Sequence, residues 1–411
     1  MRRRSGGRLV GVVAVVVVSA AAMFLSGARS GADGTAAPDP LVLRGRQLVV
    51  NHACGECHGG GDDPSNSGWL AGSKGPLMDF KAGMPPCGVD PAATGCFTTH
   101  PRNLTPDPTG MGRFTERQLF NALRYGLRPE DTPDVEITST TPGKGNFPEH
   151  PHYLAPPMPW PAWRHMSDND LHAITAYLKR GLKPVVNKVP DSEGPPDFWV
   201  SLYVPQNIGV HPAERFPTAN EIEPPANLRA RVLRGRGLVM EHGCADCHGT
   251  FAGPTAPGWL VGETSPMQDF VIGGCFADAS QPCFHGRPKN LTPDAKTGIG
   301  RFTDRQLFNA LRHGLRPEDT PDVEITSDTP GQGNFPAEPH YLGAFMPWTA
   351  FRNMPDSEIR DIIAYLQHGL KPVSNTVQPS DDTPDHWASF LSQLGRYPVP
   401  PFPTANEVGG R

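Results

Sequence analysis

The sequence predicts a mainly α-helical chain, built from two similar domains with long Pro- and Gly-rich loops, and three observations support this. The stretch RFTERQLFNALRYGLRPEDTPDVEITS begins at Arg113 and returns with few changes at Arg301. Capped amphipathic helices recur in both copies, and no run of alternating strands is visible. Gly and Pro number 45 and 48 among 411 residues, roughly twice their average share, which favours short helices joined by ordered loops.

The internal repeat sets the expected domain boundaries. The offset between the copies drifts only from 190 to 186 residues, which is far longer than a solenoid unit and typical of whole domains. We therefore expect a leader with a linker over residues 1–39, one domain over 40–225 and a second over 226–411. Each domain ends in a Pro-rich tail, and the tail motif FPTANE at 216–221 recurs at 402–407.

The N-terminus has the features of an export segment. Four arginines, at positions 2, 3, 4 and 8, precede an uncharged stretch of 17 residues over 9–25. That length lies between the core of a signal peptide and a minimal membrane span, so both a cleaved signal and a retained membrane anchor remain open. Either one places the rest of the chain outside the cytoplasm, in the periplasm or on the outer face of the membrane. The net charge of −5 argues against a nucleic-acid binder.

Three helices are expected in each copy. In the first copy they cover about 41–52, 115–125 and 168–180. Thr115 with Gln118 forms a capping-box pattern, Ser167 caps the third helix, and glycines follow the second and third. The second copy repeats the capping box at Thr303 and Gln306 and places its last helix near 355–369.

Two Cys-x-x-Cys-His motifs indicate the chemistry. They comprise Cys54, Cys57 and His58 in the first copy, and Cys244, Cys247 and His248 in the second. Two thiols three positions apart can each add to one vinyl group of a haem, and the adjacent imidazole then faces the iron, which is the signature of c-type haem attachment. A redox dithiol does not need the trailing histidine, and a zinc site needs further Cys or His ligands. We expect two covalently attached haem c groups.

A methionine is the expected sixth iron ligand in each copy. Met158 lies 100 residues after His58, Met346 lies 98 residues after His248, and each is followed by Pro-Trp. A thioether opposite the imidazole raises the reduction potential and favours electron transfer. Two rival pairs also recur in both copies. His152 and His340 would give bis-histidine ligation, whereas Met166 and Met354 directly precede the last helix and suit core packing.

The four remaining cysteines fall in one loop of each copy. We expect them to form the disulfides Cys87–Cys96 and Cys275–Cys283, because each pair is close in sequence and the compartment is oxidising. Each bond would add roughly 2–3 kcal/mol to stability by restricting the unfolded chain.

The order of these motifs resembles tandem class I cytochrome c domains. The shared features are Gly45, the Cys-x-x-Cys-His motif, the Asn-Leu-Thr-Pro-Asp loop at 103–107, Met158-Pro159 and the helix end at 176–178, each with a counterpart in the second copy. The chain is most similar to the cytochrome c subunits of membrane-bound alcohol, sugar-acid and related dehydrogenases. Those subunits often have three haems, whereas this chain has two motifs.

The resemblance also implies roles for residues outside the motifs. Gly45 with Tyr177, and Gly235 with Tyr365, would mark the crossing of the first and last helices. Trp69 and Trp259 are expected to pack in the haem pockets.

These features predict an extracytoplasmic electron carrier. Its partner would be a dehydrogenase, another cytochrome or an oxidase. Irons closed on both faces offer no substrate site, so we expect no catalysis by the chain alone. The alternative is a dihaem enzyme of the peroxidase or sulfur-compound-oxidising type, which needs two unlike haems, and the near-identity of the two copies argues against it.

Overall fold

The structure is a computed structural model, and it describes residues 37–75, 80–84, 94–192, 200–250, 252–264, 270–273, 283–343, 346–380 and 397–408. The expected leader at 9–25 lies outside the described residues. The chain divides into two units, Met1–Ala37 and Pro38–Arg411, and the second contains every element discussed below. Across the described ranges, no helix has both the length and the apolar character needed to span a membrane.

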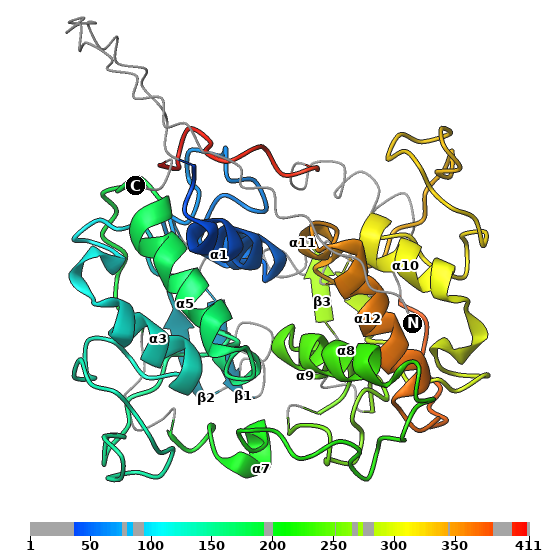
Figure 1. Cartoon of the computed structure of the whole chain (residues 1–411), viewed down its shortest axis with the longest axis horizontal. Coiled ribbons are helices and arrows are strands. Elements are labelled where there is room, and N and C mark those ends of the chain that lie inside the picture. The colour runs from blue at the N-terminus through cyan, green and yellow to red at the C-terminus, as the bar shows by residue number, and fades with distance from the viewer. Residues whose placement is uncertain are drawn as a thin grey trace, which may run out of the picture. The chain divides into compact units, whose positions relative to one another are not determined.

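Both copies of the repeat form the same succession of short helices (Figure 1). The first copy contains α1 (Pro40–Asn51), α2 (Cys54–His58), η2 (Met111–Arg113), α3 (Glu116–Tyr125), α4 (Trp160–Trp163), α5 (Asp168–Ala176) and a π-helical turn, η3 (Tyr177–Gly181). Helix α7 (Pro205–Ile208) follows. The second copy contains α8 (Arg229–Glu241), α9 (Cys244–His248), η6 (Ile299–Arg301), α10 (Asp304–His313), α11 (Trp348–Phe351) and α12 (Asp356–His368).

The predicted helix caps form as expected. The Thr115 hydroxyl accepts a hydrogen bond from the Gln118 backbone, and the Gln118 side chain accepts one from the Thr115 backbone. Thr303 and Gln306 make the same capping box at α10. Ser167 caps α5 by accepting from the backbone of Asp170. The sequence therefore specifies these helix starts locally, before any packing between helices.

The first and last helices of each copy cross at a glycine. Helix α1 packs against α5, and α8 packs against α12 (Figure 1). A Cβ atom added to Gly45 would lie 1.9 Å from the Ala173 carbonyl oxygen, and one added to Gly235 would lie 1.8 Å from that of Asp361. Only glycine permits this approach, so the crossing expected at both positions is present.

Two short hairpins correct the expectation that the copies contain no strands. Strand β1 (Phe80–Met84) pairs antiparallel with β2 (Thr94–Thr99), and β3 (Phe270–Gly273) pairs with β4 (Cys283–Gly286). Strands of four to six residues in a Gly-rich loop are too short to show a period of two, which is why the sequence did not reveal them.

The hairpins lie in the loops expected to hold the disulfides. Cys96 is part of β2 and Cys283 begins β4, but their side chains are not described. Cys87 and Cys275 lie outside the described residues. Both pairings therefore stay predictions.

The two FPTANE segments exchange partners between the copies. We call residues 216–221 the first strap and residues 402–407 the second strap. Glu407, in the second strap, accepts hydrogen bonds from Arg46 Nε at 2.6 Å and from the Tyr177 hydroxyl at 2.6 Å, both in the first copy. The strap that follows the second copy therefore closes onto the first.

The first strap makes the mirror-image contacts with the second copy. Glu221 accepts from Arg236 Nε at 2.7 Å and from the Tyr365 hydroxyl at 2.7 Å. Backbone bridges add to both contacts, joining Glu221 to Leu370 and Glu407 to Leu182. Each strap thus follows one copy in sequence and contacts the other copy.

Candidate haem-attachment sites

Each Cys-x-x-Cys-His motif forms a short helix directly after the first long helix of its copy. The chain turns between the two helices through one residue in the left-handed region, Ala53 with φ 55° in the first copy and Gly243 with φ 61° in the second. Helices α2 and α9 then hold both cysteines and the histidine within a single turn and a half. The compact turn brings together the two thiols that would attach a haem and the imidazole that would bind its iron.

Both motif histidines have one ring nitrogen fixed by the backbone. Nδ1 of His58 lies 2.7 Å from the carbonyl oxygen of Arg102, and Nδ1 of His248 lies 2.8 Å from that of Lys289. A carbonyl only accepts, so Nδ1 holds the proton and Nε2 presents its lone pair. Burial lowers the pKa of both rings, which keeps them neutral. A neutral imidazole fixed through its other nitrogen is the usual state of an iron or zinc ligand.

The Asn-Leu-Thr-Pro-Asp loop positions these carbonyl groups. Asn103 directly follows Arg102, and its side chain accepts from the Thr105 backbone at 3.0 Å and donates to the Val185 carbonyl at 2.8 Å. In the second copy Asn290 makes the equivalent bonds with Thr292 at 2.9 Å and Val373 at 2.8 Å. The loop thus orients the histidine ring from behind, a function that the sequence motif alone did not reveal.

The four motif cysteines are free and weakly acidic. Burial raises the pKa of Cys54, Cys244 and Cys247 to about 12 and that of Cys57 to about 11. A redox dithiol needs a lowered thiol pKa, so these values disfavour that alternative. In the described part of the chain, no cluster of three potential metal ligands includes a motif cysteine, which disfavours a zinc–thiolate site. The donor set fits haem c.

The two pairs of candidate methionine ligands differ in how deeply their side chains are buried. Met158 is partly buried against the core that contains Cys54 and Trp69, and Met346 packs in the same way against the core of the second copy, where Cys244 also lies. Met166 and Met354 are each 2% exposed and belong to those cores, in line with a packing role.

The rival histidines contact an acidic loop. Nδ1 of His152 lies 3.2 Å from a carboxylate oxygen of Asp131, and Nδ1 of His340 lies 3.1 Å from one of Asp319. Both rings are about one-third exposed. These contacts give the histidines a partner in the protein itself.

A buried hydrogen-bond chain supports the tryptophan beside each motif. Trp69 packs on Gly55, where an added Cβ would lie 2.4 Å from the indole ring. Its Nε1 donates to the Tyr177 hydroxyl at 2.9 Å, and that hydroxyl donates to Glu407. The second copy repeats the chain from Trp259 through Tyr365 to Glu221. We did not identify the glutamates from the sequence, although the repeated FPTANE motif was a signal for them.

Comparison with known proteins finds similar chains among the cytochrome c subunits of dehydrogenases. The chain is 26% identical to the gluconate 2-dehydrogenase cytochrome c subunit of Pantoea cypripedii over 351 residues, which cover 84% of this chain and 64% of that protein. The chain is a homologue of dehydrogenase cytochrome c subunits. It is also 26% identical to the cytochrome c subunit of the quinone-dependent alcohol dehydrogenase of Gluconacetobacter polyoxogenes, over 73% of this chain and 53% of that protein.

A third relative contains two haems by name. The diheme cytochrome c-type protein of Cereibacter sphaeroides is 28% identical over 169 residues, 40% of this chain and 45% of that protein. No family model matches the chain. The chain thus spans only about half to two-thirds of the length of the dehydrogenase cytochrome subunits. These relatives are named as cytochromes c or cytochrome c subunits, in line with the Cys-x-x-Cys-His motifs of this chain.

Proposed function

We propose that the chain is a dihaem c-type cytochrome that passes electrons from a dehydrogenase to a respiratory acceptor outside the cytoplasmic membrane. The observation that supports it most directly is the duplicated histidine geometry, with His58 and His248 each fixed through Nδ1 by a backbone carbonyl. When bound, haem c supplies a one-electron couple at its iron. The residues of the chain attach it, orient the imidazole and exclude water.

In this proposal Cys54 and Cys57 hold one haem and Cys244 and Cys247 the other. His58 and Met158 are the axial ligands of the first iron, and His248 and Met346 those of the second. The packing of both methionines on the motif cores supports them. A soft sulfur ligand gives a high-potential couple suited to accepting electrons from a dehydrogenase.

The similarity of the two sites supports a carrier rather than an enzyme. A dihaem peroxidase or sulfur-compound oxidase needs one closed and one open or unusually ligated iron, whereas both copies here repeat the same histidine, methionine and tryptophan contacts. The export segment at 9–25 and the disulfides Cys87–Cys96 and Cys275–Cys283 belong to the same proposal, because both fit an oxidising, extracytoplasmic setting.

The ligand assignment is tested by Met158→Ala in the purified haem-loaded protein. The loss of the thioether should lower one reduction potential by on the order of 100 mV or more and let that iron bind carbon monoxide, while the second haem is unchanged. Haem content, redox titration and electron paramagnetic resonance measure these effects. Two low-spin haems per chain are expected before mutation.

Two variants serve as controls for this test. Met166→Leu keeps the volume of a core residue and should leave both potentials unchanged. His152→Ala should also leave them unchanged, and an iron opened by His152→Ala instead would contradict the methionine assignment. A high-spin haem with peroxide turnover in the unmodified protein would contradict the carrier function.

A further inference from the structure

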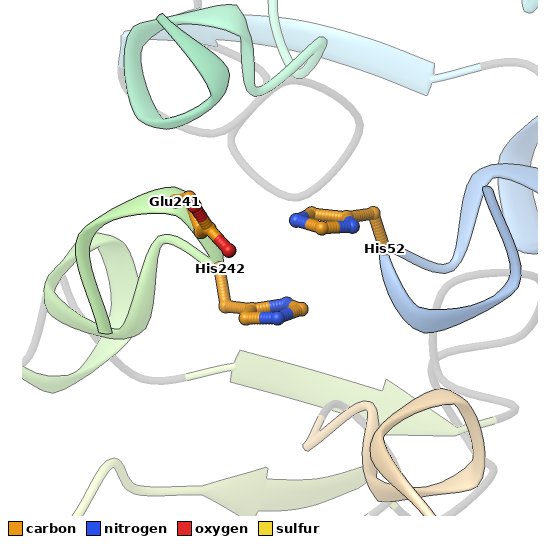
Figure 2. A group of neighbouring side chains, drawn as sticks. All are labelled: His52, Glu241 and His242. Carbon is orange, nitrogen blue, oxygen red and sulfur yellow. The ribbon is translucent and has the colours of Figure 1, made fainter. Parts of the chain in front are cut away.

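The last turns of α1 and α8 bring two equivalent histidines together. His52 follows α1 and His242 follows α8, each two residues before the first cysteine of a haem motif. Their rings stack with centroids 4.1 Å apart and planes 12° from parallel (Figure 2). The two positions are 190 residues apart in sequence, so the contact joins the two copies.

Glu241 completes a cluster of three potential ligands. One ligand atom from each of His52, Glu241 and His242 lies within 4.8 Å of the others, and the Glu241 carboxylate faces the gap beside the two rings (Figure 2). His52 and Glu241 are each only 9% exposed. The cluster is therefore largely shielded from solvent between the copies.

Two ring nitrogens in this cluster have no partner. Nε2 of His52 and Nδ1 of His242 are shielded from solvent and make no hydrogen bond. Nδ1 of His52 donates to the Leu48 carbonyl at 2.9 Å, so its Nε2 presents a lone pair. An unsatisfied buried polar atom costs about 1–3 kcal/mol, so each nitrogen needs a partner, which a metal ion or an ordered water supplies.

The surroundings keep the two rings neutral. Burial lowers the pKa of His52 to about 4 and that of His242 well below its usual value, and the Arg44 guanidinium adds to both effects. Burial raises the pKa of Glu241 to about 8, with Asp170 and Glu358 contributing, so a metal ion that binds its carboxylate at neutral pH must displace a proton. Neutral imidazoles are the form that binds metal ions.

We propose that His52, Glu241 and His242 form a site for one Zn²⁺ ion that ties the two copies together. Two imidazoles and a carboxylate are a typical zinc donor set, and nitrogen donors disfavour Mg²⁺ and Ca²⁺. Ligand atoms around tetrahedral zinc lie about 3.4 Å apart at bond lengths near 2.1 Å. The lone pairs of two nearly parallel rings do not converge on one point, so zinc binding requires one ring to rotate and the three ligand atoms to approach from their present separation of up to 4.8 Å.

The site is tested by titrating the haem-loaded full chain with ZnCl2 after removal of metal by a chelator. Calorimetry should show one strong site per chain, and saturating zinc should raise the unfolding temperature. His52→Gln and Glu241→Gln should each weaken zinc binding at least about 100-fold, since each loses a direct ligand. Haem content and Soret spectra of the variants show whether they fold.

His165→Gln is the matched control. His165 pairs with His211 in a second buried histidine contact, with ring centroids 5.3 Å apart, and this contact contains no carboxylate in the described structure. Its zinc affinity should equal that of the unmodified chain.

X-ray absorption at the zinc edge of the unmodified 1:1 complex gives a second, independent measurement. Two imidazole ligands and oxygen ligands are expected, whereas thiolate or purely oxygen coordination would overturn the proposal. Unchanged zinc affinity in both His52→Gln and Glu241→Gln would overturn it as well, without bearing on the haem assignments.

Discussion

The folded chain lowers the pKa of His165 and so disfavours the protonated form of its ring. Burial is the main reason that its pKa falls to about 3, and the Arg164 guanidinium, His211 and Arg124 lower it further. His211 has a pKa of about 4 for similar reasons. In the unfolded chain the histidine pKa has its ordinary value near 6.5. Below that pH the unfolded chain therefore binds protons at His165 and His211, whereas the folded chain does not. Stability linked to His165 is therefore present above pH 6.5 and lost as the pH falls.

The variant His165→Gln tests this effect. Between pH 7 and pH 5 the unmodified chain should lose about 1–2 kcal/mol of unfolding free energy through His165, and the variant should lose correspondingly less. Urea unfolding midpoints of both proteins at the two pH values measure the difference. Equal pH dependence in the two proteins would show that the pKa of His165 is the same in the folded and unfolded chain.

Single residues also show how far the sequence specified the sites. The cysteines and histidines of both motifs were predictable because haem attachment needs a fixed local spacing. The partners of His58 and Tyr177 were not, because the Arg102 carbonyl reaches His58 through backbone geometry and Glu407 reaches Tyr177 through a long-range contact. His52 and His242 have no local signal of their own, and only the packing of α1 and α8 brings them together.

At the scale of elements, the close crossing of two helices determines the packing of each copy. Helix α8 contains two glycines with opposite surroundings. A Cβ atom at Gly235 would collide with the α12 backbone at 1.8 Å, whereas one at Gly237 would meet no atom within 4 Å. The first glycine is required by the crossing, and the second only weakens the helix.

Alanine substitutions at these two positions should therefore act in opposite directions. Gly235→Ala should destabilise the protein by about 3 kcal/mol or more, because backbone must move to admit the methyl group. Gly237→Ala should stabilise it by about 0.5–1 kcal/mol through helix propensity. Thermal unfolding of the haem-loaded proteins measures both, and a similar loss in the two variants would contradict the crossing geometry.

Some helices and strands could be predicted from the sequence, and others could not. Helices α3 and α10 were predicted closely because a capping box and a C-terminal glycine mark both ends. The last helix of the first copy ends in a π turn at Tyr177–Gly181, and nothing in its sequence pattern indicated this change. The hairpins in the cysteine loops were missed because their pairing is set by tertiary contacts rather than by alternation.

At the scale of the whole molecule, the exchanged straps make the copies depend on each other. Glu407 and Glu221 are each 2% exposed, and each is paired with an arginine of the other copy, Arg46 and Arg236. Removal of one partner from a buried ion pair costs about 3–5 kcal/mol, because the other charge stays behind without compensation.

Glu407→Ala should accordingly destabilise the first copy, although Glu407 follows the second copy in sequence. Hydrogen exchange should speed up in α1 and α5 and stay slow in α8 and α12. Glu221→Ala should give the reverse pattern. If each variant instead lost hydrogen-exchange protection in the copy that its strap follows in sequence, the result would contradict the exchanged contacts of the straps.

The two straps also differ in the number of residues between the strap glutamate and its arginine partner. Arg236 and Glu221 are 15 residues apart, whereas Arg46 and Glu407 are 361 apart. At a synthesis rate of 5–20 residues per second, Glu407 is made roughly 20–70 s after Arg46. The first copy therefore lacks Glu407, the carboxylate partner of Arg46, until nearly the whole chain has been made. In the second copy, the partner Glu221 precedes Arg236 in the chain. The first copy therefore depends on the last residues of the chain for one of its buried ion pairs, whereas the second copy does not.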